Sequence, residues 1–171
     1  MDTFVEQIVK KQKGGKEYAI IAATILGALV LGALSLMLGM FAALFLVGIG
    51  YGAWWLITSQ NVEFEYSVTN GDIDISQIIA QRKRKIIVSV AGEKIESMAP
   101  YKPEEYAGRH FDRTVLAAIN PAGENVWCFT YHSKKNGHTL VVFQPDERVF
   151  SALKNGLPKL VQMDLNRKMA H

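Results

Sequence analysis

The sequence predicts an α+β protein in which an N-terminal two-helix transmembrane hairpin precedes an antiparallel β-barrel of six or seven strands capped by a C-terminal helix. Three observations lead to this prediction. Residues 18–62 contain no Asp, Glu, Lys, Arg or His. Residues 62–69 alternate between apolar and polar residues, which is the period-two pattern of a half-buried strand, and further strand-like runs follow them. After Pro145 the apolar residues recur at helical spacing instead.

The uncharged run is too long for one membrane-spanning helix. Its 45 residues would form a helix of about 68 Å, whereas the hydrocarbon core of a bilayer is ~30 Å thick. The best break is Leu38-Gly39-Met40, so we predict spanning helices at about 18–38 and 40–57 within a hairpin of residues 18–60. A cleavable signal peptide is disfavoured because its apolar core has only about 7–15 residues. The uncharged turn leaves open whether the hairpin crosses the bilayer fully or is re-entrant.

Basic residues flank the predicted hairpin on both sides. Four lysines precede the first helix, and the basic stretch 82–85 follows the second. By the positive-inside rule, this distribution predicts a multi-pass protein of the cell membrane with both termini in the cytoplasm. Tyr18, Trp54 and Trp55 lie at the inner ends of the helices, where amphipathic rings meet the lipid headgroups.

Small residues recur four apart on each predicted helix. Ala28 and Gly32 share one face of the first helix, and Gly48 and Gly52 share one face of the second. In lipid, such spacing lets helices approach closely. We therefore predict helix packing at these positions, either within the hairpin or between copies of it.

Residues 1–17 form a short amphipathic and basic segment. Phe4, Val5, Ile8 and Val9 fall on one side at helical spacing, ahead of the lysines. Two interpretations stay open, namely an interfacial helix lying on the inner leaflet and a frayed terminus.

Residues 61–171 carry the predicted β domain. Residues 62–69 alternate strictly, and Asn70-Gly71 follows as a strong hairpin signal. The basic stretch 82–85 is predicted as a charged turn. A helix is predicted at about 145–156, because Pro145 and Asp146 suit its first turn. The remaining predicted strands lie near residues 73–78, 86–90, 113–119, 126–132 and 139–143.

Strands closed by one amphipathic helix form the outline of a pleckstrin-homology-like (PH-like) barrel. Apolar helices that run into residues 64–73 and then into Arg82, Lys83, Arg84 and Lys85 resemble bacterial membrane proteins with a PH-like domain. More narrowly, the chain is similar to a family of small uncharacterised membrane proteins from Gram-positive bacteria. The resemblance implies a PH-like fold for residues 61–171. It implies no particular activity.

The basic stretch 82–85 is the most prominent candidate binding feature of the β domain. Facing a membrane, Arg82, Lys83, Arg84 and Lys85 would contact anionic headgroups, each contributing ~1 kcal/mol. The alternative is a solvated turn. Nucleic acid is not expected, because the cluster is short, lacks interleaved aromatic residues and belongs to a chain of net charge +3.

No pattern of catalytic or metal-binding residues is evident. The four histidines and the single cysteine, Cys128, lack metal-ligand spacing. The carboxylates at positions 63, 65, 72 and 74 alternate with apolar residues, which is typical of an exposed strand face. We therefore expect no enzyme activity, no catalytic or metal site and no cofactor.

These observations favour a non-enzymatic, membrane-anchored binding or recruitment module. Its expected partners are membrane lipids together with a protein partner or further copies of the chain. The alternative is a structural subunit of a larger membrane assembly that associates through its transmembrane helices.

Overall fold

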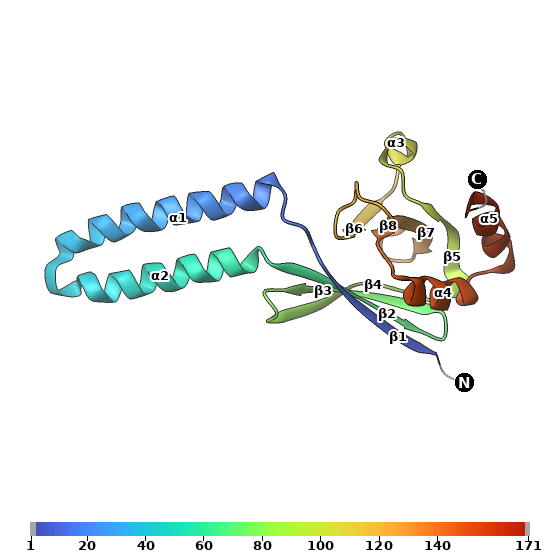
Figure 1. Ribbon diagram of the computed structural model, residues 1–171, viewed down its shortest axis with the longest axis horizontal. Coiled ribbons are helices and arrows are strands. Elements are labelled where there is room, and N and C mark those ends of the chain that lie inside the picture. Colours follow the sequence, from blue (N-terminus) through green and yellow to red (C-terminus); the bar gives the residue numbers. More distant parts are fainter. Residues whose placement is uncertain (1–2, 170–171) are drawn as a thin grey trace.

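The structure, a computed structural model, describes residues 3–169 (Figure 1). Two helices extend away from a domain that is built from two small sheets and covered by further helices. The elements in chain order are β1 (Phe4–Lys10), α1 (Gly15–Ser35), η1 (Leu36–Phe41), α2 (Ala42–Ser59), β2 (Val62–Thr69), β3 (Asp72–Ile79), β4 (Lys83–Val90), η2 (Gly92–Lys94), β5 (Ile95–Pro100), α3 (Pro103–Tyr106), β6 (Arg113–Ala117), β7 (Trp127–Ser133), β8 (Gly137–Phe143), α4 (Glu147–Gly156) and α5 (Lys159–Met169).

The strands form two four-stranded sheets, in the orders β1-β2-β3-β4 and β5-β7-β8-β6. The predicted single barrel of six or seven antiparallel strands is therefore wrong. Within residues 3–169 no ladder joins the two sheets. The chain passes from β4 in the first sheet through η2 to β5 in the second. One pair, β6 with β8, is also parallel. The predicted hairpin turn at Asn70-Gly71 is confirmed, since it joins β2 to β3 with positive φ angles of 52° and 90°.

The N-terminal segment is a strand, so both the interfacial helix and the frayed terminus predicted within residues 1–17 are wrong. β1 pairs antiparallel with β2, from Phe4 opposite Thr69 to Lys10 opposite Glu63. Val9 is buried, whereas Phe4 and Ile8 are exposed on the opposite face. The apolar residues of this segment fit a period of two as well as a period of 3.6, and pairing with β2 satisfies the backbone of both strands.

A glutamine on β1 joins the N-terminal strand to the C-terminal half of the domain. The Gln7 amide Nε2 donates to the Gln144 carbonyl at 3.3 Å, and its Oε1 accepts from the Asp146 N–H at 2.7 Å. Both partners lie between β8 and α4. β1 therefore belongs to the β domain, and the apolar helices are inserted between its first two strands.

The inserted apolar segment Gly15–Ser59 is 45 residues long. By length and composition it is a candidate for crossing a membrane. Its helical geometry is broken at Gly39, where φ is 56° and ψ is −121°. The chain reverses there, and α1 and α2 lie side by side (Figure 1).

The two sheets and the C-terminal helices share one apolar core. Tyr66 of β2 connects the sheets, because its buried hydroxyl donates to the Ala117 carbonyl and accepts from the Gln144 N–H. Burial raises the pKa of this hydroxyl well above its usual range. The largest fully buried side chains include Tyr66, Ile73, Ile75, Phe129, Phe143, Leu153 and Leu165.

Two helices, not one, follow the last strand. α4 begins two residues later than the predicted 145, because Asp146 is its N-cap and accepts from the Val149 N–H at 2.8 Å. α5 was not predicted. Its apolar residues are few, yet Val161 and Leu165 are four apart and both are buried in the core.

Three glycines meet where the β2–β3 turn, η2 and the end of α4 pack together. A Cβ atom on Gly156 would lie 2.4 Å from the Gly71 Cα, and one on Gly92 would lie 2.3 Å from the Gly71 carbonyl oxygen. Such distances are shorter than any van der Waals contact, so only glycine fits this backbone crossing.

We predict that Gly156→Ala destabilises the protein by about 2 kcal/mol, because the added methyl group forces the two backbones apart. For a chain of this size, the melting temperature in detergent should fall by roughly 4–8 °C. Gly108→Ala is the matched control, since a Cβ there meets nothing within 4 Å. Equal melting temperatures for the two variants would contradict the close packing.

Candidate functional site

Three chain segments converge where the helices join the first sheet. The linker after β1 leads into α1, and α2 returns through residues 60–61 into β2. The Lys11 N–H donates to the Val62 carbonyl at 2.9 Å. This hydrogen bond holds the linker before α1 beside the start of β2. The β3–β4 turn joins them, because the Ala80 N–H donates to the Asn61 carbonyl at 2.8 Å.

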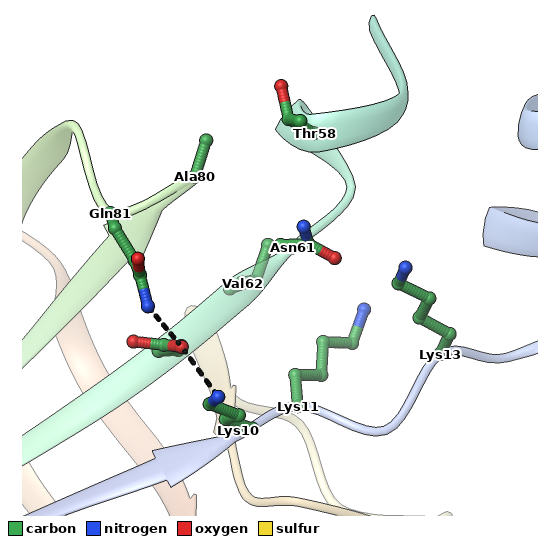
Figure 2. Close-up of a pocket in the computed structure, with 9 residues that line it drawn as sticks. Lys10, Lys11, Lys13, Thr58, Asn61, Val62, Ala80 and Gln81 are labelled. Atoms are coloured by element: carbon green, nitrogen blue, oxygen red, sulfur yellow. Dashed lines mark hydrogen bonds and ion pairs between the residues drawn. The ribbon is translucent and has the colours of Figure 1, made fainter. Parts of the chain in front are cut away.

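These segments enclose a pocket of about 410 Å³, called the junction pocket below (Figure 2). Its most prominent side chains are three lysines from the end of β1 and the linker. In Figure 2 the amines of Lys11 and Lys13 point toward the side of the pocket on which Asn61 lies. The pocket is lined by Lys10, Lys11, Lys13, Thr58, Asn61, Val62, Glu63, Ala80 and Gln81.

The charges around the junction pocket are predominantly positive. Lys10 Nζ lies 3.6 Å from Glu63 Oε1, and Lys11 Nζ lies 2.6 Å from Glu17 Oε1. Lys13 forms no ion pair with any residue in the range 3–169. The pocket is therefore suited to a small anion, because ammonium groups are donors without acceptor capacity.

The wall contributed by the β3–β4 turn has an unusual backbone. Ala80 and Gln81 adopt left-handed conformations with φ of 54° and 56°. For residues with a Cβ this conformation costs roughly 1–2 kcal/mol each. The hydrogen bond from Ala80 to Asn61 holds the turn in place, so this wall is fixed relative to the lysines.

The basic stretch 82–85 is divided between the junction and β4. Arg82 is the only one of the four in a turn, and its Nη2 donates to Thr58 Oγ1 at 2.9 Å. Its guanidinium carbon lies 5.1 Å from the ring centroid of Trp54, a cation–π arrangement. Lys83, Arg84 and Lys85 begin β4, so the predicted four-residue turn is wrong. The strand extends to Lys83 because this residue pairs with Ile79 across the ladder.

Arg84 has a structural partner in the first sheet. It forms an ion pair with Glu65 on β2, reaching across β3, and the Glu65 side chain is only 5% exposed. The prediction that Glu65 lies on an exposed strand face is therefore wrong. The sequence contains no signal for this pair, because it depends on the registers of two ladders.

The predicted interface aromatics lie close to this junction. Tyr18 is in the first turn of α1, and Trp54 and Trp55 are in the last two turns of α2. At least half of each side chain is exposed in the protein alone. Their role at the headgroup level stays a prediction.

The predicted small-residue positions do not share one environment. A Cβ on Gly32 would lie 3.6 Å from Leu46 Cδ2, so Gly32 faces α2. Ala28 and Gly52 instead line a shallow groove of about 300 Å³ between the two helices. Gly48 is exposed and does not line this groove.

A second basic cavity, of about 530 Å³, lies between α3 and α5. α5 is at the end of the domain away from α1 and α2 (Figure 1). The Arg109 guanidinium lies over the ring of Tyr106, 5.1 Å from its centroid. The basic residues lining the cavity are Lys102, Arg109, Arg167 and Lys168.

No cluster of three or more His, Cys, Asp or Glu side chains within residues 3–169 is arranged to hold a metal ion. Cys128 is buried, and this burial raises the pKa of its thiol. The junction pocket was not predicted from the sequence. In the sequence, the lysines indicate only which side of the membrane the chain end occupies. The pocket forms only when β1 pairs with β2, and that pairing was not predicted.

The fold and the junction define an α+β protein in which a two-sheet domain carries a long apolar helical insertion. The chain belongs to the bacterial PH-like domain family DUF6106, whose family model matches residues 1–163. This match confirms the resemblance to bacterial PH-like proteins. The narrower resemblance to a family of Gram-positive bacteria stays a prediction. Neither a curated protein nor a solved structure matches the chain.

The Glu65–Arg84 pair gives a stability prediction for the basic stretch. Arg84→Met should cost about 1–3 kcal/mol, because it leaves a buried carboxylate without a partner. Lys85→Met is the matched control, since Lys85 is exposed and forms no ion pair with the residues described. Thermal unfolding in detergent measures both variants. If Arg84→Met melts at the control temperature, Arg84 has no structural role.

Proposed function

We propose that the protein is a non-enzymatic binding module anchored in the cell membrane by a helical hairpin, with its PH-like domain held against the inner surface. The pairing of β1 with β2 carries this proposal. These strands flank the apolar segment. Lys10, the last residue of β1, lies opposite Glu63 near the start of β2.

The strand pairing supports an even number of membrane crossings. A chain that enters the bilayer after β1 has to return to the same side before β2, because the two strands share one ladder. α1 has 21 residues and α2 has 18. Both lie within the roughly 17–25 residues of a helix that crosses the membrane once. A multi-pass hairpin satisfies both constraints.

The charge distribution supports a cytoplasmic domain. The lysines before α1 lie at the same end of the hairpin as Arg82, which contacts the last turns of α2 through Thr58 and Trp54. The reversal at Gly39 carries no charge of either sign. By the positive-inside rule, the junction end faces the cytoplasm and both termini lie there.

Contact with anionic lipid is the proposed role of the surface formed by Arg82, Lys83 and Lys85, beside the junction pocket. Arg82, Lys83 and Lys85 are exposed, and basic groups near an anionic leaflet contribute ~1 kcal/mol each. The cavity between α3 and α5 is on the opposite end of the domain, so a soluble acidic partner has access to it while the junction contacts lipid. Binding and recruitment, without catalysis, are therefore the proposed activities.

Cysteine labelling in intact cells tests the topology. In a Cys128→Ala background, we expect Met37→Cys, beside the reversal, to react with a membrane-impermeant maleimide added outside. Lys135→Cys, in the β7–β8 turn, should react only after the membrane is permeabilised. External labelling of Lys135→Cys in sealed cells would contradict the proposal.

A second candidate function is a structural subunit of a larger membrane assembly, favoured by the shallow groove that contains Ala28 and Gly52. If helix packing between chains uses this groove, Gly52→Leu should abolish oligomers seen by cross-linking in the membrane. Gly48→Leu is the matched control, because Gly48 does not line the groove. Unchanged oligomers in both variants would argue against this function.

A further inference from the structure

We infer that the junction pocket binds one phosphate group, supplied by the headgroup of an anionic phospholipid, as a defined site. This inference rests on the proposed membrane anchoring and makes its lipid contact specific. It differs from general surface attraction, which needs no pocket and has no fixed stoichiometry.

The balance of charge in the pocket calls for an anion. Of its three lysines, Lys10 and Lys11 each have one carboxylate neighbour, Glu63 and Glu17. Lys13 is half-buried and forms no ion pair within residues 3–169. A phosphate oxygen placed between Lys11 and Lys13 would give Lys13 the partner that the protein does not provide.

Hydrogen-bond donors are available beside the two amines. The side-chain amide of Asn61 lines the pocket and forms no hydrogen bond to a side chain or backbone group within the described residues. The Thr58 hydroxyl is already engaged with Arg82 and the Trp54 carbonyl. In Figure 2 the amide oxygen of Asn61 lies nearer the two amines than its nitrogen does. Two ammonium groups, and the Asn61 amide once its side chain turns the nitrogen toward them, can therefore surround an anionic oxygen without breaking an existing contact.

The position of the pocket points to a phosphate and to a lipid source. The pocket is lined by the lysines that lead into α1 and by Thr58 near the end of α2, one helical turn from Trp54. In the proposed anchoring this is the level of the headgroups, where phosphate is the most abundant anion. No aromatic side chain lines the pocket, so it offers no stacking surface for a nucleotide base.

The pocket is also preorganised. The hydrogen bond from Lys11 to Val62 fixes the wall formed by the linker after β1, and the hydrogen bond from Ala80 to Asn61 fixes the wall formed by the left-handed turn at Ala80 and Gln81. A site whose walls are fixed before binding loses less conformational entropy when the ligand enters. This feature favours retention of one lipid during extraction.

The test is native mass spectrometry of the full chain extracted in mild detergent, with phosphatidylglycerol or phosphatidylcholine added. We expect one phosphatidylglycerol per chain and no comparable phosphatidylcholine adduct. Lys13→Gln should weaken the adduct about five- to tenfold. Lys135→Gln, which removes an exposed lysine of the β7–β8 turn that does not line the pocket, should retain it. Melting temperatures verify that both variants fold.

Two results would overturn the inference: equal retention by Lys13→Gln and Lys135→Gln, or equal binding of the two lipids. Inorganic phosphate added as a competitor distinguishes the source. Displacement of bound phosphatidylglycerol by millimolar phosphate supports a phosphate-specific site, whereas binding of phosphate with no lipid adduct overturns the lipid source. The labelling experiment on Met37→Cys and Lys135→Cys fails or succeeds separately, so a wrong topology and a wrong site are distinguishable.

Discussion

The β1–β2 ladder is the interaction on which the rest of the structure depends. It joins residues on both sides of a 45-residue apolar segment and fixes both ends of that segment at one edge of the β domain. Gln7 strengthens this arrangement, because its amide connects β1 to the backbone between β8 and α4. The hairpin is thus an insertion into a sheet and not an N-terminal tether, so the domain has little freedom to move away from the helices.

The same constraint creates the junction pocket. Lys10 ends β1, and Lys11 and Lys13 follow in the linker to α1, while Thr58 and Asn61 come from the end of α2 and the segment that leads to β2. Arg82 adds a contact from the β3–β4 turn to α2 through Thr58 and Trp54. The proposed anchor and the proposed binding surface are therefore parts of one structure. The strained turn at Ala80 and Gln81 is held in place by the hydrogen bond from Ala80 to Asn61.

Local patterns in the sequence predict much of the fold but not its long-range pairing. The alternation in residues 62–69 and the Asn70-Gly71 turn give β2 and β3 directly, because both signals are local. The segment around Phe4, Val5, Ile8 and Val9 fits a helix and a strand equally well, and only the presence of β2 as a neighbour decides. Arg84 illustrates the same limit at the candidate site, since its pairing with Glu65 depends on two registers. The lysines are visible in the sequence, but their convergence into a pocket is not.

The most direct measurement of the central claim is a disulfide cross-link between β1 and β2 in native membranes. Glu6 and Ser67 lie opposite each other, between the hydrogen-bonded pairs of the ladder, where paired Cα atoms are only ~4.5 Å apart. With Cys128→Ala, Glu6→Cys and Ser67→Cys should form an intrachain disulfide under mild oxidation, and Glu6→Cys with Lys135→Cys should not. Rapid cross-linking of the first pair alone is the predicted result. Failure of that pair to cross-link would contradict the account, because the two ends of the apolar segment would then be free of each other.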